Sequence, residues 1–116
     1  MGNKASSLSS IEFTQKTNET LDKLYVAFLQ LAKENDAGFI QVQRTPSSLV
    51  VTVKKIGSYT ITSNSGVFSM QSPQSGLYNY SWDSANGFWK SQTQEHILEE
   101  LLVREFCAHS KGLLNL

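Results

Sequence analysis

The side chains best suited to chemistry in this chain are one cysteine and two histidines, and they do not form a recognised set. Cys107 is the only cysteine, so no internal disulfide can form, and with only His96 and His109 it makes no zinc site. A lone cysteine fits best with a reducing compartment. The sequence has no nucleophile motif, no glycine-rich phosphate loop and no Ser-His-Asp partnership at usable spacing. No enzyme class therefore follows from these residues.

The composition predicts one globular domain. At 116 residues and 40% hydrophobic content, the chain is long enough for one core but not for two. Its ten basic and ten acidic residues cancel, so neither a nucleic-acid surface nor a polybasic membrane patch is indicated. No apolar run approaches the roughly 20 residues of a membrane-spanning helix, so no transmembrane segment is expected.

Residues 1–8 are expected to be a disordered leader, followed by a single domain over residues 9–116. The first six residues match the pattern for N-myristoylation at Gly2. The same stretch is rich in serine and lacks acids, as the remnant of a transit peptide is, although it contains no arginine. Three origins stay open for it: a native leader, a processed leader and a by-product of expression cloning.

A first helix of about 25 residues is predicted from residue 9 onward. Ser9 and Glu12 have the spacing of a capping box. Apolar and small residues then recur at steps of three and four, which is the pattern of an amphipathic helix, at Thr17, Leu21, Leu24, Phe28 and Leu31. The helix is expected to end near residues 35–38, with Gly38 as the C-cap.

The middle of the chain reads as a series of short strands. A β-branched run at 49–53 predicts a buried strand, and further strands are predicted around 39–44, 59–62, 67–72, 79–82 and 88–90. Turns are expected at 63–66 and at Asn86-Gly87. Alternation in the strand at 67–72 places Phe68 and Met70 on one face and Ser69 and Gln71 on the other.

A second helix is predicted to start at Thr93 as N-cap, with Glu95 in its first turn. Its apolar stripe is Leu98, Leu101, Leu102 and Phe106, and it is expected to end at residues 111–112. The leucine-rich tail that follows, with Leu113, Leu114 and Leu116, is placed to cover the open end of the core. His96 and His109 are expected on this helix as surface or rim residues, because no further ligand lies at metal-binding spacing.

These elements predict an α+β fold. It is a two-layer α/β sandwich, with two helices packed on one face of an antiparallel sheet of about five to six strands. The side chains expected to be buried between the layers are Tyr80, Trp82, Phe68, Met70, Leu24, Phe28, Leu98 and Leu102.

This order of elements and one string of residues resemble the frataxin family. The string runs Ser72-Pro73-x-Ser75-Gly76-x-x-x-Tyr80-x-Trp82, with Trp89 after six further residues. Segments of both helices, at residues 19–24 and 99–102, also match the family without gaps, and the resemblance covers about residues 9–114.

The resemblance implies a ridge of carboxylates on the first helix that is linked to iron binding and to docking on the cysteine desulfurase. The ridge positions in this sequence are Asn18, Glu19, Asp22, Val26, Leu29, Gln30 and Lys33. Only Glu19 and Asp22 are acidic, and a hard iron cation needs several oxygen donors to compete with water. Weak iron binding at Glu19 and Asp22 is therefore expected, and an ordinary solvated helix face is the alternative.

The resemblance also implies a partner-binding surface on the polar face of the sheet, where the family meets the iron–sulfur scaffold protein. The positions that this implies are Thr62, Asn64, Val67, Ser69, Gln71 and Asn79. Ser69 stands where the family usually has an exposed Trp, Thr62 where it has an Asn, and Asn79 where it has an Arg. An aromatic anchor and a cation, both important in interfaces, are thus absent.

The function that the resemblance implies is regulation of iron–sulfur cluster assembly, by docking on the cysteine desulfurase–scaffold complex, with weak binding of ferrous or ferric iron. Two alternatives stay open: an iron chaperone or ferroxidase, and a frataxin-fold module that binds a different protein partner. Ferroxidase activity rests on the resemblance alone. The resemblance places the chain in the mitochondrial matrix or a mitochondrion-related organelle, the alternative being the cytoplasm with an N-myristoyl anchor at Gly2.

Overall fold

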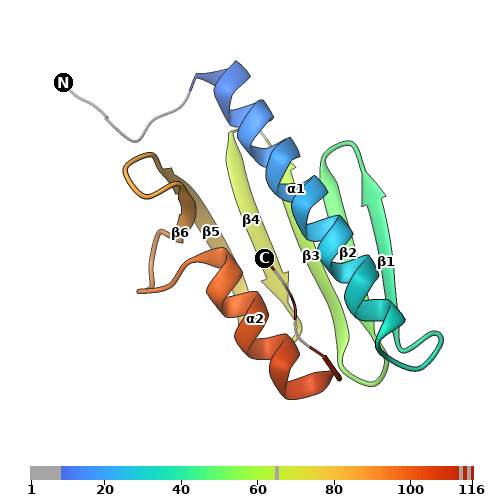
Figure 1. The fold of residues 1–116 in the computed structure, drawn as a ribbon. Coiled ribbons are helices and arrows are strands. Elements are labelled where there is room, and N and C mark those ends of the chain that lie inside the picture. The colour runs from blue at the N-terminus through green and yellow to red at the C-terminus, as the bar shows by residue number, and fades with distance from the viewer. Residues whose placement is uncertain (1–8, 65, 113, 115) are drawn as a thin grey trace.

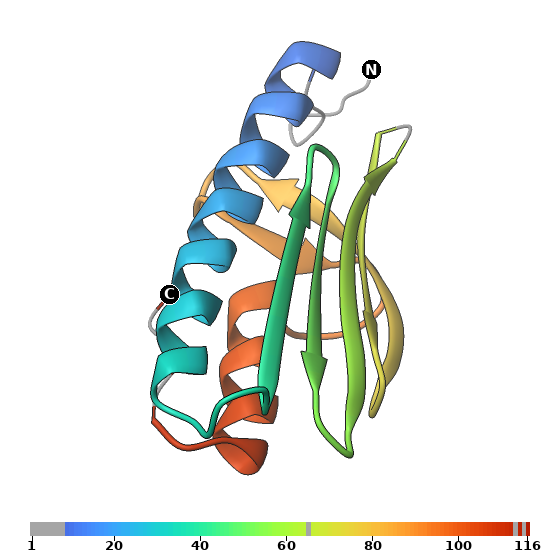
Figure 2. The ribbon, with the colours of Figure 1, turned by 90° about the vertical axis from the view of Figure 1, so that its right-hand side faces the viewer.

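The described chain folds into two helices and a six-stranded antiparallel sheet (Figure 1). A computed structural model describes residues 9–64, 66–112, 114 and 116. The elements are α1 (Ser10–Lys33), β1 (Ile40–Thr45), β2 (Ser48–Val53), β3 (Gly57–Asn64), β4 (Val67–Ser72), β5 (Gly76–Asp83), β6 (Phe88–Ser91) and α2 (Leu98–His109). The strands are neighbours in chain order, and both helices lie on one face of the sheet (Figure 2). The α+β sandwich is confirmed; the expected leader, residues 1–8, lies outside the described residues.

Helix α1 begins as the sequence predicts and ends earlier. The Ser9 hydroxyl accepts from the Glu12 amide, and the Glu12 carboxylate accepts from the Ser9 amide, which completes the capping box. The prediction of Gly38 as C-cap is wrong, because the cap is Glu34. The side chain of Asn35 donates to the carbonyl of Leu31 and so satisfies part of the helix end. Gly38, at φ +81°, instead shapes the turn into β1.

The sheet register places the apolar side chains toward the helices. Phe68 and Met70 are fully buried, whereas Gln71 is exposed on the opposite face, as alternation predicts. Ser63 and Asn64, expected in a turn, are the last two residues of β3 and pair with β4. Ser65, expected in the same turn, lies outside the described residues.

The prediction for the start of the second helix is wrong. Helix α2 begins at Leu98, after an N-cap residue, Ile97, that makes no side-chain capping bond. The Ser91 hydroxyl accepts from the amides of Thr93 and Gln94, which fixes a turn where the helix was expected. The chain then stays on the edge of β6, where the amide of Ser91 donates to the carbonyl of His96. Thr93, Glu95 and His96 are therefore outside the helix.

The helix also ends earlier than expected, at His109 rather than at residues 111–112. Its C-cap is Ser110, whose amide and hydroxyl both donate to the carbonyl of Phe106. Of the tail, Leu114 is buried and Leu116 is partly buried against the core, as expected for a segment that covers its open end. Leu113 lies outside the described residues.

The core between the layers contains the predicted residues with one exception. Phe106 of α2 packs against Phe28 of α1 and Tyr59 of β3, with ring centroids 4.7 Å apart in both pairs. Trp82 was expected to be buried but is only partly buried. It lies at the rim, against Trp89, with the ammonium of Lys16 5.2 Å from its ring.

A carboxylate on α2 joins the helix to the Ser-Pro turn between β4 and β5. Glu105 accepts hydrogen bonds from Tyr59 at 2.7 Å, from Ser72 at 2.8 Å and from Ser75 at 2.5 Å. The Ser72 hydroxyl also accepts from the amides of Gln74 and Ser75, so it closes the turn that it anchors. Burial alone raises the pKa of the Glu105 carboxyl, but the three hydrogen bonds outweigh it and the pKa is lowered.

Replacing Glu105 with Gln is expected to destabilise the fold at neutral pH by about 1–3 kcal/mol, because buried hydroxyls lose a charged acceptor. The folded carboxyl has a lowered pKa, so its contribution is present above the unfolded pKa of about 4.3 and is lost as pH falls through the folded pKa. Urea unfolding at a series of pH values measures both effects. Glu100→Gln, at an exposed position on the same helix, is the control. Equal losses in the two variants would contradict the role of Glu105.

Candidate functional site

The two carboxylates predicted to bind iron lie on the exposed side of α1, and each already has a cationic neighbour. The Glu19 carboxylate is 3.7 Å from the Lys16 ammonium. The Asp22 carboxylate accepts from Nη2 of Arg44, on β1, at 2.9 Å. Both carboxylates remain well exposed to water, at 67% and 72% of the side chain. Any metal ion at this place must therefore compete with two cations as well as with water.

No third acidic, histidine or cysteine side chain joins these two to form a metal-binding group in the described part of the chain. The same side of α1 instead exposes apolar residues. Val26 is 66% exposed and Leu29 is 38% exposed, and the cation Lys33 follows one turn later. This surface thus combines few oxygen donors with an apolar centre. Its chemistry suits contact with another macromolecule at least as well as binding of a small cation.

The six residues predicted to bind a partner do share one face of the sheet. Thr62 lies opposite Ser69, and Ser69 lies opposite Asn79, so these three form a row across β3, β4 and β5. The hydroxyls of Thr62 and Ser69 are 3.2 Å apart and hydrogen-bonded. Asn64 lies opposite Val67 at one end of the same face. No described element covers this face, which is the one turned away from the helices (Figure 2).

The outer face has an apolar residue that the sequence reasoning missed. Leu77 lies opposite Gln71 and is 60% exposed. The sequence contained a signal for it, because Leu77 is two residues before Asn79 and residues two apart on a strand share a face. Leu77 and Val67, which is 43% exposed, are thus two exposed apolar side chains on an otherwise polar face.

Over strands β1 to β4 the outer face carries no charged side chain among the described residues, whereas Asp83 on β5 and Lys90 on β6 lie on it at the far edge. Every second residue of a strand points outward, as does the residue opposite it on the neighbouring strand. On β1 to β4, all the described residues that point outward in this way are neutral. They are Gln41, Gln43, Thr45, Ser48, Val50, Thr52, Ser58, Thr60, Thr62, Asn64, Val67, Ser69 and Gln71. A partner on this face would make hydrogen bonds and apolar contacts rather than ion pairs.

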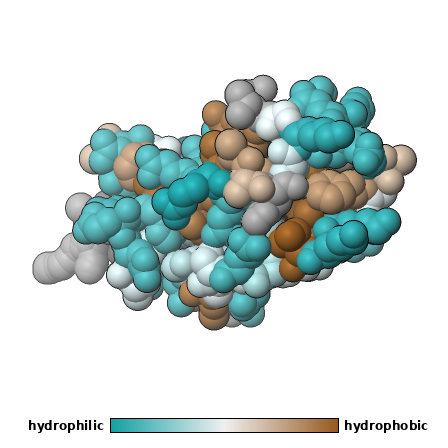
Figure 3. All heavy atoms as spheres, turned by 90° about the horizontal axis from the view of Figure 1, so that it is seen from below, coloured by the Kyte–Doolittle hydropathy of each residue, from teal (hydrophilic) through white to brown (hydrophobic). Residues whose placement is uncertain are grey.

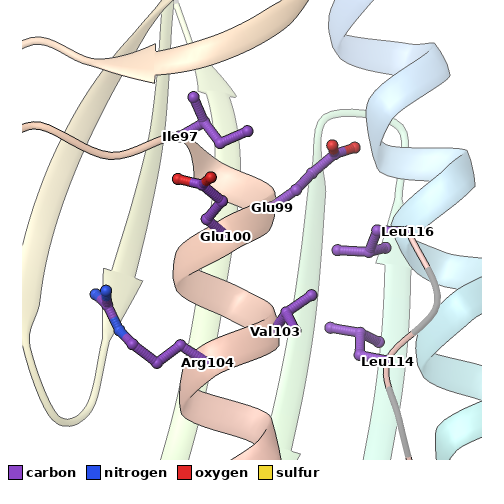
Figure 4. Close-up of a pocket in the computed structure, with 7 residues that line it drawn as sticks. All are labelled: Ile97, Glu99, Glu100, Val103, Arg104, Leu114 and Leu116. Carbon is purple, nitrogen blue, oxygen red and sulfur yellow. The ribbon is translucent and has the colours of Figure 1, made fainter.

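A groove of about 460 Å³ lies on the other side of the molecule, along α2 (Figure 4). Val103 on α2 and Leu114 and Leu116 on the tail face one another across it. Its rim is charged, and one rim residue, Glu99, accepts from the Lys23 ammonium at 2.7 Å. In the space-filling view from below, hydrophobic patches are exposed between hydrophilic side chains (Figure 3). Among the described residues that line the groove there is no histidine or cysteine.

The side chain of His96 packs between two tyrosines of β5 and has a structural role. Its Nε2 is 2.8 Å from the Tyr80 hydroxyl, and its ring packs edge-on against Tyr78 at 4.8 Å. Burial, followed by the nearby Arg104 cation, lowers the pKa of His96, and burial raises the pKa of Tyr80. The imidazole therefore ties the segment before α2 to β5. The side chain of His109 lies outside the described residues.

These features agree with comparisons with known proteins. The model of the frataxin-like domain family matches residues 6–112. No curated protein matches the chain. Two helices on one face of a six-stranded antiparallel sheet define the frataxin fold. The chain belongs to the frataxin-like family, as the resemblance of its Ser-Pro turn and tryptophans indicated.

Solved structures with a similar fold include frataxins from the yeast Saccharomyces cerevisiae and from Psychromonas ingrahamii. Trimeric frataxin from Saccharomyces cerevisiae, complexed with ferrous iron, is 20% identical with a TM-score of 0.74, over 84% of this chain and 87% of that one. The same yeast protein with its full-length N-terminus is 19% identical with a TM-score of 0.72, over 94% and 84%. Frataxin from Psychromonas ingrahamii is 14% identical with a TM-score of 0.72, over 93% and 97%.

The geometry of α1 predicts weak iron binding, with a dissociation constant in the high-micromolar range or weaker, because two paired carboxylates supply too few oxygens. Titration with ferrous iron under anaerobic conditions, followed by calorimetry and by NMR line broadening, measures affinity and place. Broadening is expected around Glu19 and Asp22 and is expected to disappear in the Glu19→Gln, Asp22→Asn double variant. Glu100→Gln is the matched control. Tight binding of several ions, or broadening centred far from α1, would contradict this account.

Proposed function

We propose that this protein regulates iron–sulfur cluster assembly by docking on a complex of a cysteine desulfurase and its scaffold protein. Membership of the frataxin family implies an iron-related function. The observation that carries the finer proposal is the continuous, uncovered row of Thr62, Ser69 and Asn79 on the outer face of the sheet. These are the positions that correspond to the family's scaffold-binding residues.

The proposed docking uses two chemically different surfaces. The outer face supplies hydroxyl and amide groups with the apolar points Val67 and Leu77. Helix α1 supplies negative charge through Glu19 and Asp22 toward a basic patch on the desulfurase. Because Ser69 replaces the aromatic anchor, we expect a weaker contact than in members of the family that have the Trp. The charged part of the contact adds rate and specificity more than affinity.

An iron-chaperone or ferroxidase function is the second candidate. The yeast frataxin complexed with ferrous iron supports iron binding within the family. In this chain, Arg44 already occupies one oxygen of Asp22, and such a function would need donors beyond the two carboxylates. The third candidate, a module for a different protein partner, is favoured by the exposed Leu77 beside a position without the aromatic anchor.

The proposed location is the mitochondrial matrix or a mitochondrion-related organelle, with the cytoplasm and an anchor at Gly2 as the alternative. Neither described helix is long and apolar enough to cross a membrane. Gly2 itself lies outside the described residues.

The docking proposal predicts opposite effects from two sets of substitutions. Ser69→Trp is expected to strengthen binding to the desulfurase–scaffold complex by about 2 kcal/mol, roughly 30-fold, by restoring an anchor. Glu19→Lys with Asp22→Lys is expected to weaken binding and to reduce its salt dependence. Binding by surface plasmon resonance at several salt concentrations, together with the rate of cluster formation, measures both.

Gln41→Trp is the control for the added tryptophan, because Gln41 is exposed on the same face but at the edge strand β1. It is expected to leave binding unchanged. If Ser69→Trp and the charge reversals alter neither binding nor the rate of cluster formation, the partner is a different protein, and the family likeness extends to the fold only.

A further inference from the structure

Helix α1 carries an exposed stripe, defined here as Asp22, Val26, Leu29 and Lys33, whose pattern is self-complementary. The spacings are four, three and four residues, which is the spacing of a coiled-coil seam. At about 100° per residue, the four side chains fall within about 60° around the helix axis. All four side chains are exposed in the described part of the chain.

The stripe matches a second copy of itself when the two helices run in opposite directions. A two-fold axis midway between residues 27 and 28 places Val26 opposite Leu29 of the other copy, and it places Asp22 opposite Lys33. Each of these contacts then occurs twice, as in any interface in which both copies use the same patch. The apolar pairs lie at the centre and the opposite charges lie outside them.

Both charged residues are available for this pairing. Lys33 forms no ion pair among the described residues. Asp22 contacts Arg44 through Oδ1, while its Oδ2 has no partner among the described residues. On this register Tyr25 faces Gln30 and Lys23 faces Ala32, so no like charges meet within residues 22–33. We propose that α1 forms an antiparallel homodimer contact through the stripe.

The contact is expected to be weak and reversible, because each copy contributes only two apolar side chains to its centre. It would cover Asp22, so the dimer and the proposed desulfurase contact would compete for the same side of α1. The inference goes beyond the proposed function and does not depend on it, since self-association is measured on this chain alone.

Charge reversal tests the pairing most directly. Sedimentation equilibrium of the full chain, from micromolar to millimolar concentration and with a chelator present to exclude bridging metal ions, is expected to show a monomer–dimer equilibrium. Asp22→Lys alone and Lys33→Glu alone each place like charges together twice, and each is expected to weaken the dimer about tenfold. The double variant restores opposite charges and is expected to recover the original affinity. Thermal unfolding of each variant checks that the monomer is intact.

The apolar centre is tested with a matched control. Val26→Asn and Leu29→Asn are expected to abolish the dimer, whereas Leu77→Asn, which removes an exposed leucine from the outer face, is expected to have no effect. Spin labels at Ile11→Cys, in a Cys107→Ser background, are expected about 50 Å apart in an antiparallel pair, against about 10 Å in a parallel one. A chain that stays monomeric throughout, or a double reversal that stays as weak as the single ones, would overturn the proposal.

Discussion

The Glu105 carboxylate is the point on which the arrangement of the two layers depends. Glu105 on helix α2 connects the helix to β3 through Tyr59, to the end of β4 through Ser72 and to the following turn through Ser75. A charged acceptor with several donors is a strong and directional contact, so it fixes the helix in both position and rotation. The rotation matters because it directs Phe106 into the core between Phe28 and Tyr59. The hydrogen bonds of Glu105 and the burial of the apolar side chains of α2 therefore favour the same orientation of the helix.

The backbone around this point is equally constrained. Gly57, at the start of β3, has φ +128°, and a Cβ atom there would lie 2.8 Å from Cβ of Pro73. The proline therefore packs directly on a position where only glycine fits. This gives a physical reason for the Ser-Pro-x-Ser-Gly string by which the fold could be identified. Ser72 and Ser75 donate hydrogen bonds to the Glu105 carboxylate, and Ser72 also closes the turn. Pro73 packs against Gly57, where a larger residue would clash.

Most of the fold could be predicted from the sequence because most of it depends on local patterns. The capping box at Ser9 and the alternation around Phe68 act over a few residues, and both were confirmed. The predictions fail where contacts between residues far apart in the sequence determine the local structure. Thr93 is a good N-cap residue, but the Ser91 turn and the pairing of residues 90 and 97 keep that segment on β6, so the helix cannot begin there. Trp82 has the right parity for burial but lies at the rim of the layer.

For the candidate surfaces, too, local patterns could be predicted from the sequence and long-range contacts could not. Alternation was enough to place Ser69 and Asn79 on one face, whereas the pairing of Asp22 with Arg44 joins residues 22 apart and has no signal in the sequence. That pairing changes how α1 can act. Because the outward residues of β1 to β4 are neutral whereas α1 carries charges, salt weakens contacts made by α1 far more than contacts made by these strands. A partner that spans both surfaces would therefore bind in two separable parts, one set by charge and one by shape.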